Sequence, residues 1–175
     1  ELLNLLAPYG FELRTLADFD QAIDVVEDGD SFAANAALKA TQQAQHLGHW
    51  VLGEDSGISV TALEGAPGIF SARYAGENAT DDENNRLLIA NLADVAPARR
   101  GAHYTCHMAL SDPSGKVHIS IEAYCHGRIR LEPAGTAGFG YDPYFEVLEY
   151  HHTFGQLGDT VKSVISHRAR AMRLL

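Results

Sequence analysis

The chain has 175 residues, with 13 Lys and Arg against 23 Asp and Glu, so its formal net charge is −10. An acidic surface repels extended polyanions at long range, which argues against a nucleic-acid polymer or an anionic membrane as a partner. With 46% hydrophobic residues the chain can bury a core, and its length predicts one domain, with room for two lobes.

Residues 1–10, ELLNLLAPYG, have the pattern of the end of an amphipathic helix that Pro8 and Gly10 stop. The pattern enters the helix midway, and no initiator Met precedes it. We therefore expect that the start of this helix, and whatever precedes it, is missing from the sequence.

The clearest helix is predicted over residues 31–47, with a cap at Asp30 or Ser31. Alanines recur every four residues on one face, and Gly48 can end the helix. A second stripe of the same helix is polar and consists of Asn35, Lys39 and Gln43.

The segment GEDSG at residues 53–57 is predicted to be a tight polar turn between strands over residues 50–53 and 58–63. It places the adjacent carboxylates of Glu54 and Asp55 at a strand end, where ligands bind in α/β folds. Neighbouring carboxylates either repel each other or share a hard cation, for which Mg²⁺ is the natural candidate. The alternative is an acidic turn that binds nothing.

Two further patterns are structural. Thr80 and Glu83 have the spacing of a capping box, which predicts a second helix that starts at Thr80. Residues 103–131 alternate with a period of two around an Asp-Pro-Ser-Gly turn, which predicts a long antiparallel hairpin with one solvated, polar side. Cys106 and Cys125 lie in this hairpin without Cys-x-x-Cys spacing, so we expect buried, structural cysteines.

The segment GTAGFGYDP at residues 135–143 combines glycines with aromatic residues. Its glycines let the backbone approach a ligand or adopt a positive φ. Phe139 or Tyr141 can stack on a planar base, and Asp142 adds an acceptor. The segment matches no P-loop or dinucleotide pattern. The alternative is a glycine-rich turn with packed aromatic side chains.

The segment KSVISHR at residues 162–168 lies in a helix predicted from about residue 160 to 175, a stretch without acidic residues. His167 and Arg168 can project together if the helix starts or breaks at this point. Such a cluster of bases binds an anion or a polar base, or else it is a solvated helix end whose cations suit the helix dipole.

These segments, together with GAPGIFSARYAG at residues 65–76, occur in the order and spacing of one family. From Glu1 to Leu175 the chain resembles the Ham1-like non-canonical purine NTP pyrophosphatases, the inosine and xanthosine triphosphate pyrophosphatases. The resemblance implies an α/β fold with a long mixed twisted sheet and flanking helices that form two lobes around a central cleft. It also implies a homodimeric, Mg²⁺-dependent enzyme that splits ITP, dITP or XTP into the monophosphate and pyrophosphate.

By the same resemblance, Asp55 is the catalytic aspartate, a Mg²⁺ ligand and the base for the attacking water. Phe139 would stack on the purine, and His167 and Arg168 would donate to a 6-keto oxygen that adenine lacks. A site built on such donors can reject the wrong base by up to ~10⁴ to 10⁵. The substrate contacts implied in this way are Ser56, Phe139, Gly140, Tyr141, Asp142, Lys162, His167 and Arg168.

Two features depart from the family. Its opening Thr/Ser-x-Asn-x-x-Lys loop is not in this sequence, and Ala34 stands where the family usually has a metal-binding Glu, just before Asn35. Glu54 could partly compensate as a metal ligand, or Mg²⁺ could be held chiefly by Asp55, phosphate and water. One alternative is therefore a nucleotide-binding homologue with weak or lost catalysis. Another is a pyrophosphatase of modified pyrimidine nucleotides.

The sequence has no window near the roughly 18 apolar residues of a membrane span and no signal-peptide pattern, which predicts a cytoplasmic protein. We expect residues 1–175 to form a single domain that lacks its first strand and the start of its first helix.

Overall fold

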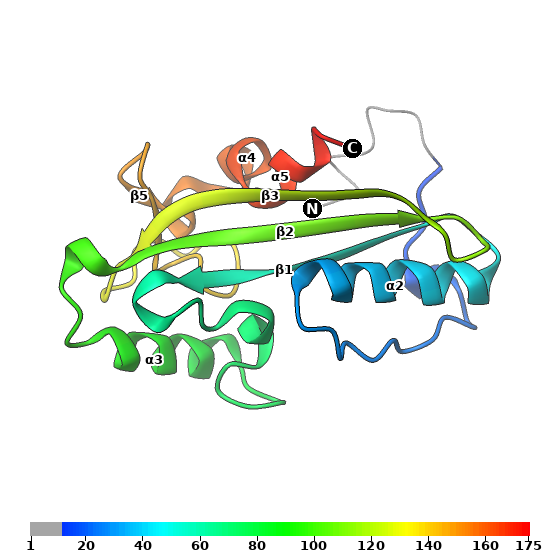
Figure 1. The fold of residues 1–175 in the computed structure, drawn as a ribbon. Helices are drawn as coiled ribbons and strands as arrows, with labels where there is room; N and C mark the ends of the chain where they lie inside the picture. The colour runs from blue at the N-terminus through cyan, green and yellow to red at the C-terminus, as the bar shows by residue number, and fades with distance from the viewer. Residues whose placement is uncertain (1–11) are drawn as a thin grey trace. The chain divides into compact units, whose positions relative to one another are not determined.

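The computed structural model describes residues 12–175 (Figure 1). The helix end predicted at residues 1–10 lies outside these described residues. The helices are α2 (Phe32–Leu47), α3 (Asp81–Leu92), α4 (Phe154–Ile165) and α5 (His167–Met172). The strands are β1 (Val51–Val60), β2 (Gly101–Ser111), β3 (Val117–Ile129), β4 (Phe145–Val147) and β5 (His152–Thr153). The short 3₁₀ helix η2 (Leu16–Asp18) precedes α2, and η3 (Thr61–Leu63), η4 (Gly68–Arg73) and η5 (Pro97–Arg99) lie between β1 and β2.

The strands of the described residues form one sheet in the order β1-β2-β3-β4-β5. Figure 1 shows β1, β2 and β3 as long strands that run in alternating directions. β4 pairs antiparallel with the end of β3, and β5 pairs antiparallel with β4. The predicted α/β class, a sheet with flanking helices, is confirmed. Parallel pairing, which a mixed sheet would also contain, is not seen between these strands of residues 12–175.

The chain forms two compact units, each built from segments that are distant in the sequence. The described part of unit 1 comprises residues 12–55, 106–123 and 168–175. Its buried apolar clusters consist of alanines from α2 and from other segments, together with Cys106, Met108 and Met172. Unit 2 comprises residues 56–105 and 124–167. Its larger core contains aliphatic and aromatic side chains of β1, α3, β4 and α4. Each unit therefore has a core of its own.

The predicted starts of α2 and α3 are confirmed. The Ser31 hydroxyl accepts a hydrogen bond from the Ala34 amide, and Gly48 ends α2 with a φ of 69°. At α3, Thr80 and Glu83 form the capping box that their spacing predicts. Both caps satisfy amides that would otherwise lack acceptors at the first turn of a helix.

The helix predicted over residues 160–175 is wrong in its bounds. α4 begins at Phe154 and kinks at Gly158, which has a φ of 72°. The backbone becomes extended at Ser166, and α5 begins at His167, so the helix breaks at SHR, which is the condition under which His167 and Arg168 could project together. A sequence pattern does not reveal that α4 starts so early, because Gly155 and Gly158 are typical turn residues.

The turn predicted at residues 53–57 is wrong, because β1 runs through this segment without interruption. Gly53 is buried, and a Cβ at this position would overlap the backbone of Ala36 and Ala40 in α2. The glycine therefore permits close packing of a helix on a strand and does not make a turn. The second strand of the prediction ends at Val60, where η3 follows.

The hairpin predicted between residues 103 and 131 is confirmed as β2 and β3. The second half of β3 alternates between buried and exposed residues, which confirms its solvated polar side. Cys106 and Cys125 are buried and form no disulfide. None of the helices in residues 12–175 has the length and apolar character needed to cross a membrane.

Candidate active site

Asp55 lies in the middle of β1, and its carboxylate is hydrogen-bonded to side chains of α2. Its Oδ1 accepts a hydrogen bond from Lys39 Nζ at 2.9 Å, and its Oδ2 accepts one from Asn35 Nδ2 at 3.3 Å. Only 12% of the Asp55 side chain is exposed. Because Asn35 and Lys39 are four residues apart, one face of α2 presents both donors to the carboxylate.

The polar stripe of α2 also binds the extended segment that precedes the helix. Lys39 Nζ lies 3.1 Å from Glu27 Oε2. One helical turn further along, the side-chain amide of Gln43 bonds both backbone groups of Ile23. The segment therefore runs antiparallel to α2, as Figure 1 shows, and this path places Glu27 beside Lys39.

Burial dominates the electrostatics of Asp55. It raises the pKa of the Asp55 carboxyl, and the negative charge of Glu27 adds to this effect. The hydrogen bond and charge of Lys39, with the hydrogen bond from Asn35, act in the opposite direction. A carboxylate with a raised pKa is a stronger proton acceptor than an ordinary Asp.

Glu27 and Asp55 form a pair of carboxylates around the ammonium of Lys39. Carboxylate oxygens suit Mg²⁺, which commonly uses one or two of them together with water and substrate phosphates. In the described part of the chain, no group of three His, Cys, Asp or Glu residues is arranged to hold a metal. The donor set fits a Mg²⁺ ion that binds together with a phosphate.

Glu54 forms its hydrogen bonds with residues outside the cluster around Asp55. Successive side chains of a strand point to opposite faces of the sheet, so Glu54 and Asp55 diverge. Glu54 Oε1 accepts hydrogen bonds from Arg168 Nε at 3.1 Å and from the Cys106 thiol at 3.5 Å. The geometry does not bring the two neighbouring carboxylates to one cation, and it offers Glu27 as the carboxylate near Asp55.

In unit 2, residues 135–143 form the glycine-rich loop that the sequence predicts. Gly135, Gly138 and Gly140 all have a positive φ. At Gly138 a Cβ would also overlap the Asp142 carboxylate. Asp142 Oδ2 accepts a hydrogen bond from the Phe139 amide at 2.9 Å, which closes the loop around this glycine.

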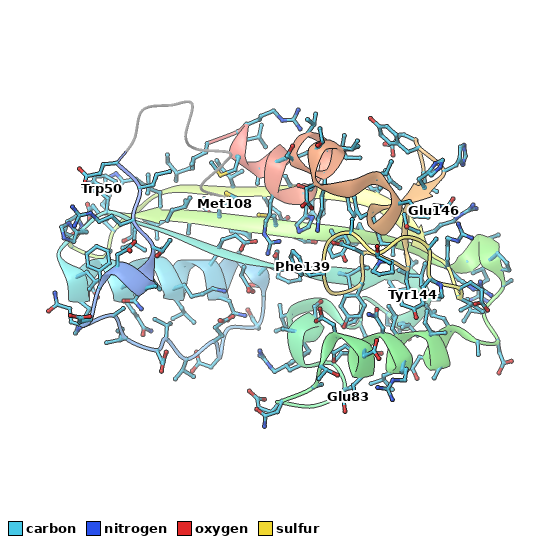
Figure 2. All side chains as sticks on the ribbon, turned by 180° about the vertical axis from the view of Figure 1, so that it is seen from behind. Trp50, Glu83, Met108, Phe139, Tyr144 and Glu146 are labelled. Carbon is cyan, nitrogen blue, oxygen red and sulfur yellow. The ribbon has the colours of Figure 1, made fainter. Side chains whose placement is uncertain are left out.

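A buried ion pair supports the same loop. Lys162 and Asp142 are 5% and 1% exposed, and Lys162 Nζ donates to Asp142 Oδ2. The same ammonium lies 4.4 Å from the centroid of the Phe139 ring. Phe139 itself, labelled in Figure 2, is 58% exposed. The pair therefore fixes the position of Phe139 while its ring stays accessible for stacking.

The first turns of α3 hold the peptide groups of Gly140. The Gly140 amide donates to Asp81 Oδ2 at 2.7 Å, and its carbonyl accepts from Asn85 Nδ2 at 2.9 Å. The next residue, Tyr141, is buried and donates its hydroxyl to the Ser71 carbonyl at 2.7 Å. Burial raises the pKa of the Tyr141 hydroxyl, so it remains a donor at neutral pH.

The remaining predicted residues divide between the two units. Ser56 follows Asp55 in β1 and begins a segment of unit 2. His167 is 3% exposed and stacks on Tyr104, with ring centroids 4.7 Å apart and planes 8° from parallel. Arg168 belongs to unit 1, where it pairs with Glu54.

Five residues of this arrangement were not predicted from the sequence as functional. Asn35 and Lys39 were identified only as members of a polar helix stripe. Asp81 is in an acidic run that a helix start explains, and Asn85 and Glu27 belong to no motif. The polar stripe of α2 is the signal that could have found Glu27. A buried helix face that carries a lysine requires a nearby acid, and several acids lie just before this helix.

Comparison with known proteins places this geometry in a family. The Ham1 family model matches residues 1–175. The chain is 55% identical over 174 residues to the dITP/XTP pyrophosphatase of Rhodopirellula baltica, an alignment that covers 99% of this chain and 84% of the relative. Solved structures of Ham1 proteins from Coxiella burnetii and Staphylococcus aureus both superpose with a TM-score of 0.89, at 34% and 35% identity. Each covers 99% of this chain, which covers 88% of each of them. The chain belongs to the Ham1 family.

Proposed function

We propose that this protein hydrolyses the non-canonical purine nucleoside triphosphates dITP, ITP and XTP to the monophosphate and pyrophosphate, and so cleanses the nucleotide pool. The observation that carries the proposal is the partly buried Asp55 carboxylate beside Lys39 and Glu27, in a chain 55% identical to a dITP/XTP pyrophosphatase. Hydrolysis of a phosphoanhydride requires a base for water and cations for the phosphates. This cluster can supply both.

The donor set supports Mg²⁺ as the cofactor, with Glu27 and Asp55 as its protein ligands. When bound, the ion neutralises triphosphate charge and lowers the pKa of the attacking water. Glu54 is less suited to this role, because its carboxylate is already paired with Arg168.

Asp55 would orient the attacking water and accept its proton, a role that its raised pKa favours. Asn35 would keep the carboxylate oriented through the bond to Oδ2. Lys39 would offset the negative charge of the two acids and donate to a phosphate oxygen as negative charge develops on it.

Phe139 would stack on the purine, held by Lys162 and Asp142. His167 and Arg168 are the proposed donors to the 6-keto oxygen. A buried donor that loses its acceptor is costly, so such donors favour hypoxanthine and xanthine over adenine. Guanine also carries the 6-keto group, and we propose that crowding at the 2-position rejects it.

The alternative of a homologue without efficient catalysis rests on Ala34. The cluster contains two carboxylates without any contribution from position 34, because Glu27 lies beside Lys39. The geometry therefore gives no support to lost catalysis. The pyrimidine alternative finds no support in the relatives, which are named for dITP and XTP.

We further propose that the chain acts as a homodimer in the cytoplasm and that residues 1–175 act as a single domain. Support for a single domain comes from the interleaved segments of the two units, because neither unit is a continuous stretch of chain that could fold alone. The dimer rests on the family resemblance, and light scattering of the purified protein tests it.

Pyrophosphate release from dITP, ITP, XTP, GTP and ATP in the presence of Mg²⁺ tests the activity. We expect kcat/KM for dITP to exceed the values for GTP and ATP by about 100-fold or more. Equal rates on all five nucleotides, or no release of pyrophosphate from any of them, would contradict the proposal.

Asp55→Asn should lower kcat by about 10² to 10⁴, the usual contribution of a general base, while dITP binding stays measurable. Asp82→Asn is the matched control, because Asp82 is an exposed acid that lies outside the cluster. Ala34→Glu separates the two main hypotheses. An active enzyme gains little from this change, whereas a homologue with a defective metal site gains strongly.

A further inference from the structure

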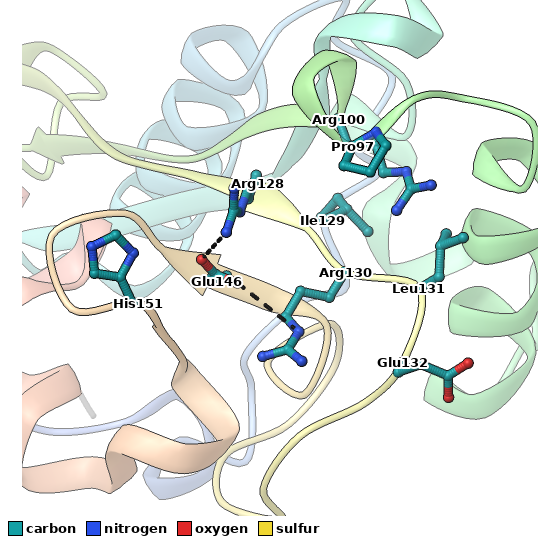
Figure 3. A pocket seen from close by; sticks show the side chains of 9 residues that line it. All are labelled: Pro97, Arg100, Arg128, Ile129, Arg130, Leu131, Glu132, Glu146 and His151. Atoms are coloured by element: carbon teal, nitrogen blue, oxygen red, sulfur yellow. Dashed lines mark hydrogen bonds and ion pairs between the residues drawn. The ribbon is translucent and has the colours of Figure 1, made fainter.

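A pocket of about 490 Å³ lies at the end of β3 in unit 2 (Figure 3). Its volume is within the ~300 to 1,000 Å³ of typical small-molecule sites. None of its lining residues belongs to the candidate active site, so the proposed function leaves it unexplained. The charged groups used below are Arg100, Arg128, Arg130, Glu132, Glu146 and His151.

Glu146 organises two of the arginines. It lies directly opposite Arg128 in the pairing of β3 with β4, and Arg128 Nη2 is 2.6 Å from its Oε1. Arg130 Nε is 3.9 Å from Glu146 Oε2, and Figure 3 shows both ion pairs as dashed lines. Glu146 is only 4% exposed. One buried carboxylate neutralises one guanidinium, so the trio keeps a net positive charge.

Arg100 adds a third guanidinium whose position is fixed. Its Nε donates to the Val95 carbonyl at 2.7 Å, and its own carbonyl accepts from the Ile129 amide at 2.9 Å. Over residues 12–175, no protein acceptor is found for the terminal nitrogens of this guanidinium. Arg100 therefore presents oriented donors at the pocket wall.

The lining as a whole is cationic in a chain whose net charge is −10. The lining carries three guanidinium groups and two carboxylates, those of Glu132 and Glu146, together with the imidazole of His151. The planar fork of a guanidinium matches two phosphate oxygens, which makes arginine the preferred residue for recognising phosphate. Apolar contact with a ligand is available from Ile129 and Leu131.

We propose that this pocket is a second ligand site, which binds a phosphate-bearing small molecule of up to nucleotide size. Arg100 and Arg130 hold the phosphate, while Glu146 keeps Arg128 and Arg130 in place. The chemistry recognised is the phosphate group, supplied either by free pyrophosphate or by a nucleoside monophosphate. The proposal does not depend on the activity proposed above.

Calorimetric titration of the full chain with pyrophosphate and, separately, with inosine monophosphate tests the site. We expect a binding event at this pocket in the wild type, in addition to any event at the proposed active site. Arg100→Gln should weaken the pocket event by about 10- to 100-fold, the usual effect of losing a charged hydrogen-bond donor. The double variant Arg100→Gln/Arg130→Gln should remove that event. Whichever probe binds more tightly at this event identifies the source of the phosphate.

Arg99→Gln is the matched control, because Arg99 is the exposed neighbour of Arg100, loses the same charge and does not line the pocket. It should leave the pocket event unchanged. An equal loss in Arg99→Gln, or wild-type binding that both pocket variants retain, overturns the proposal. Circular dichroism and thermal melts check that the variants are folded.

The hydrolysis assay is read separately, and pocket variants should keep kcat and KM for dITP. Absence of hydrolysis in every variant would reject the activity and leave the pocket result standing.

Discussion

The ammonium of Lys39 lies between two carboxylates, 2.9 Å from Asp55 Oδ1 and 3.1 Å from Glu27 Oε2. One lysine thus offsets the repulsion between two carboxylates that belong to different segments of the chain. A divalent ion bound by these acids must compete with Lys39 for their oxygens. In the proposed site the lysine would therefore both stabilise the metal-free cluster and compete with the metal.

Lys39→Met tests this competition. Removal of the ammonium leaves two carboxylates without their cation, so we expect Mg²⁺ to bind the free protein about tenfold more tightly in a calorimetric titration. Turnover of dITP should nevertheless fall by about 100-fold or more, because a donor to the phosphates is lost. Lys116→Met, which removes an exposed lysine in the β2–β3 turn, should change neither quantity. Weaker Mg²⁺ binding in Lys39→Met would contradict the competition.

The bonds from α3 to Gly140 predict a role for two residues that do not belong to any recognised motif. Asp81→Ala and Asn85→Ala each remove one bond that fixes the peptide groups next to Phe139. If Phe139 stacks on the base, each change should raise KM for dITP by about tenfold and leave kcat nearly unchanged, because base binding is lost equally in the ground and transition states.

Asp82→Ala is the control for these variants, because Asp82 is exposed at the same helix start and bonds no part of the loop. Steady-state kinetics with dITP and thermal melts of all three variants separate an effect on the loop from a loss of folding. A fall in kcat with an unchanged KM would contradict the assigned role.

Asp112 predicts a dependence of stability on pH. Its carboxylate accepts hydrogen bonds from the Ser114 hydroxyl at 2.6 Å and from His118 at 2.6 Å, and these bonds hold the pKa of Asp112 well below its usual range. In the window between the lowered folded pKa and the ordinary value near 4, the unfolded chain binds more protons. The stabilisation from Asp112 is therefore complete above about pH 4 and is lost as the pH falls through this window.

Asp112→Ala should accordingly lower Tm at pH 7, and the difference from the wild type should shrink as melts are repeated towards pH 2. Asp94→Ala changes an exposed acid and serves as the control. A Tm difference that stays constant over this range would show that the turn bonds do not act through the charge of Asp112.

The parts of the fold that followed from the sequence are those with local causes. The caps at Ser31 and Thr80 and the period of the hairpin depend on residues a few positions apart. The uninterrupted course of β1 could not be predicted from the sequence. Gly53 is required there because the backbone of α2 packs against it, and a local sequence pattern does not contain that contact.

The candidate site shows the same division. Asp55 and Phe139 were recognised as members of motifs. Glu27 was missed because its partner Lys39 is 12 residues away and meets it only through the path of the segment before α2. Asp81 was missed for the same reason, since 59 residues separate it from Gly140. In both cases the bond depends on tertiary structure, although the donor and acceptor are visible in the sequence.

The buried pair of Lys162 and Asp142 gives the sharpest prediction of stability. Lys162→Met keeps the length and packing of the side chain but leaves the Asp142 carboxylate buried without this cation. Breaking one side of a buried ion pair should lower the free energy of unfolding by about 3 to 5 kcal/mol, measured by urea denaturation. The double variant Lys162→Met/Asp142→Asn removes the stranded charge and should recover a large part of this loss. Simple addition of the two single effects would show that the residues are not coupled, and that Lys162 serves only the ring of Phe139.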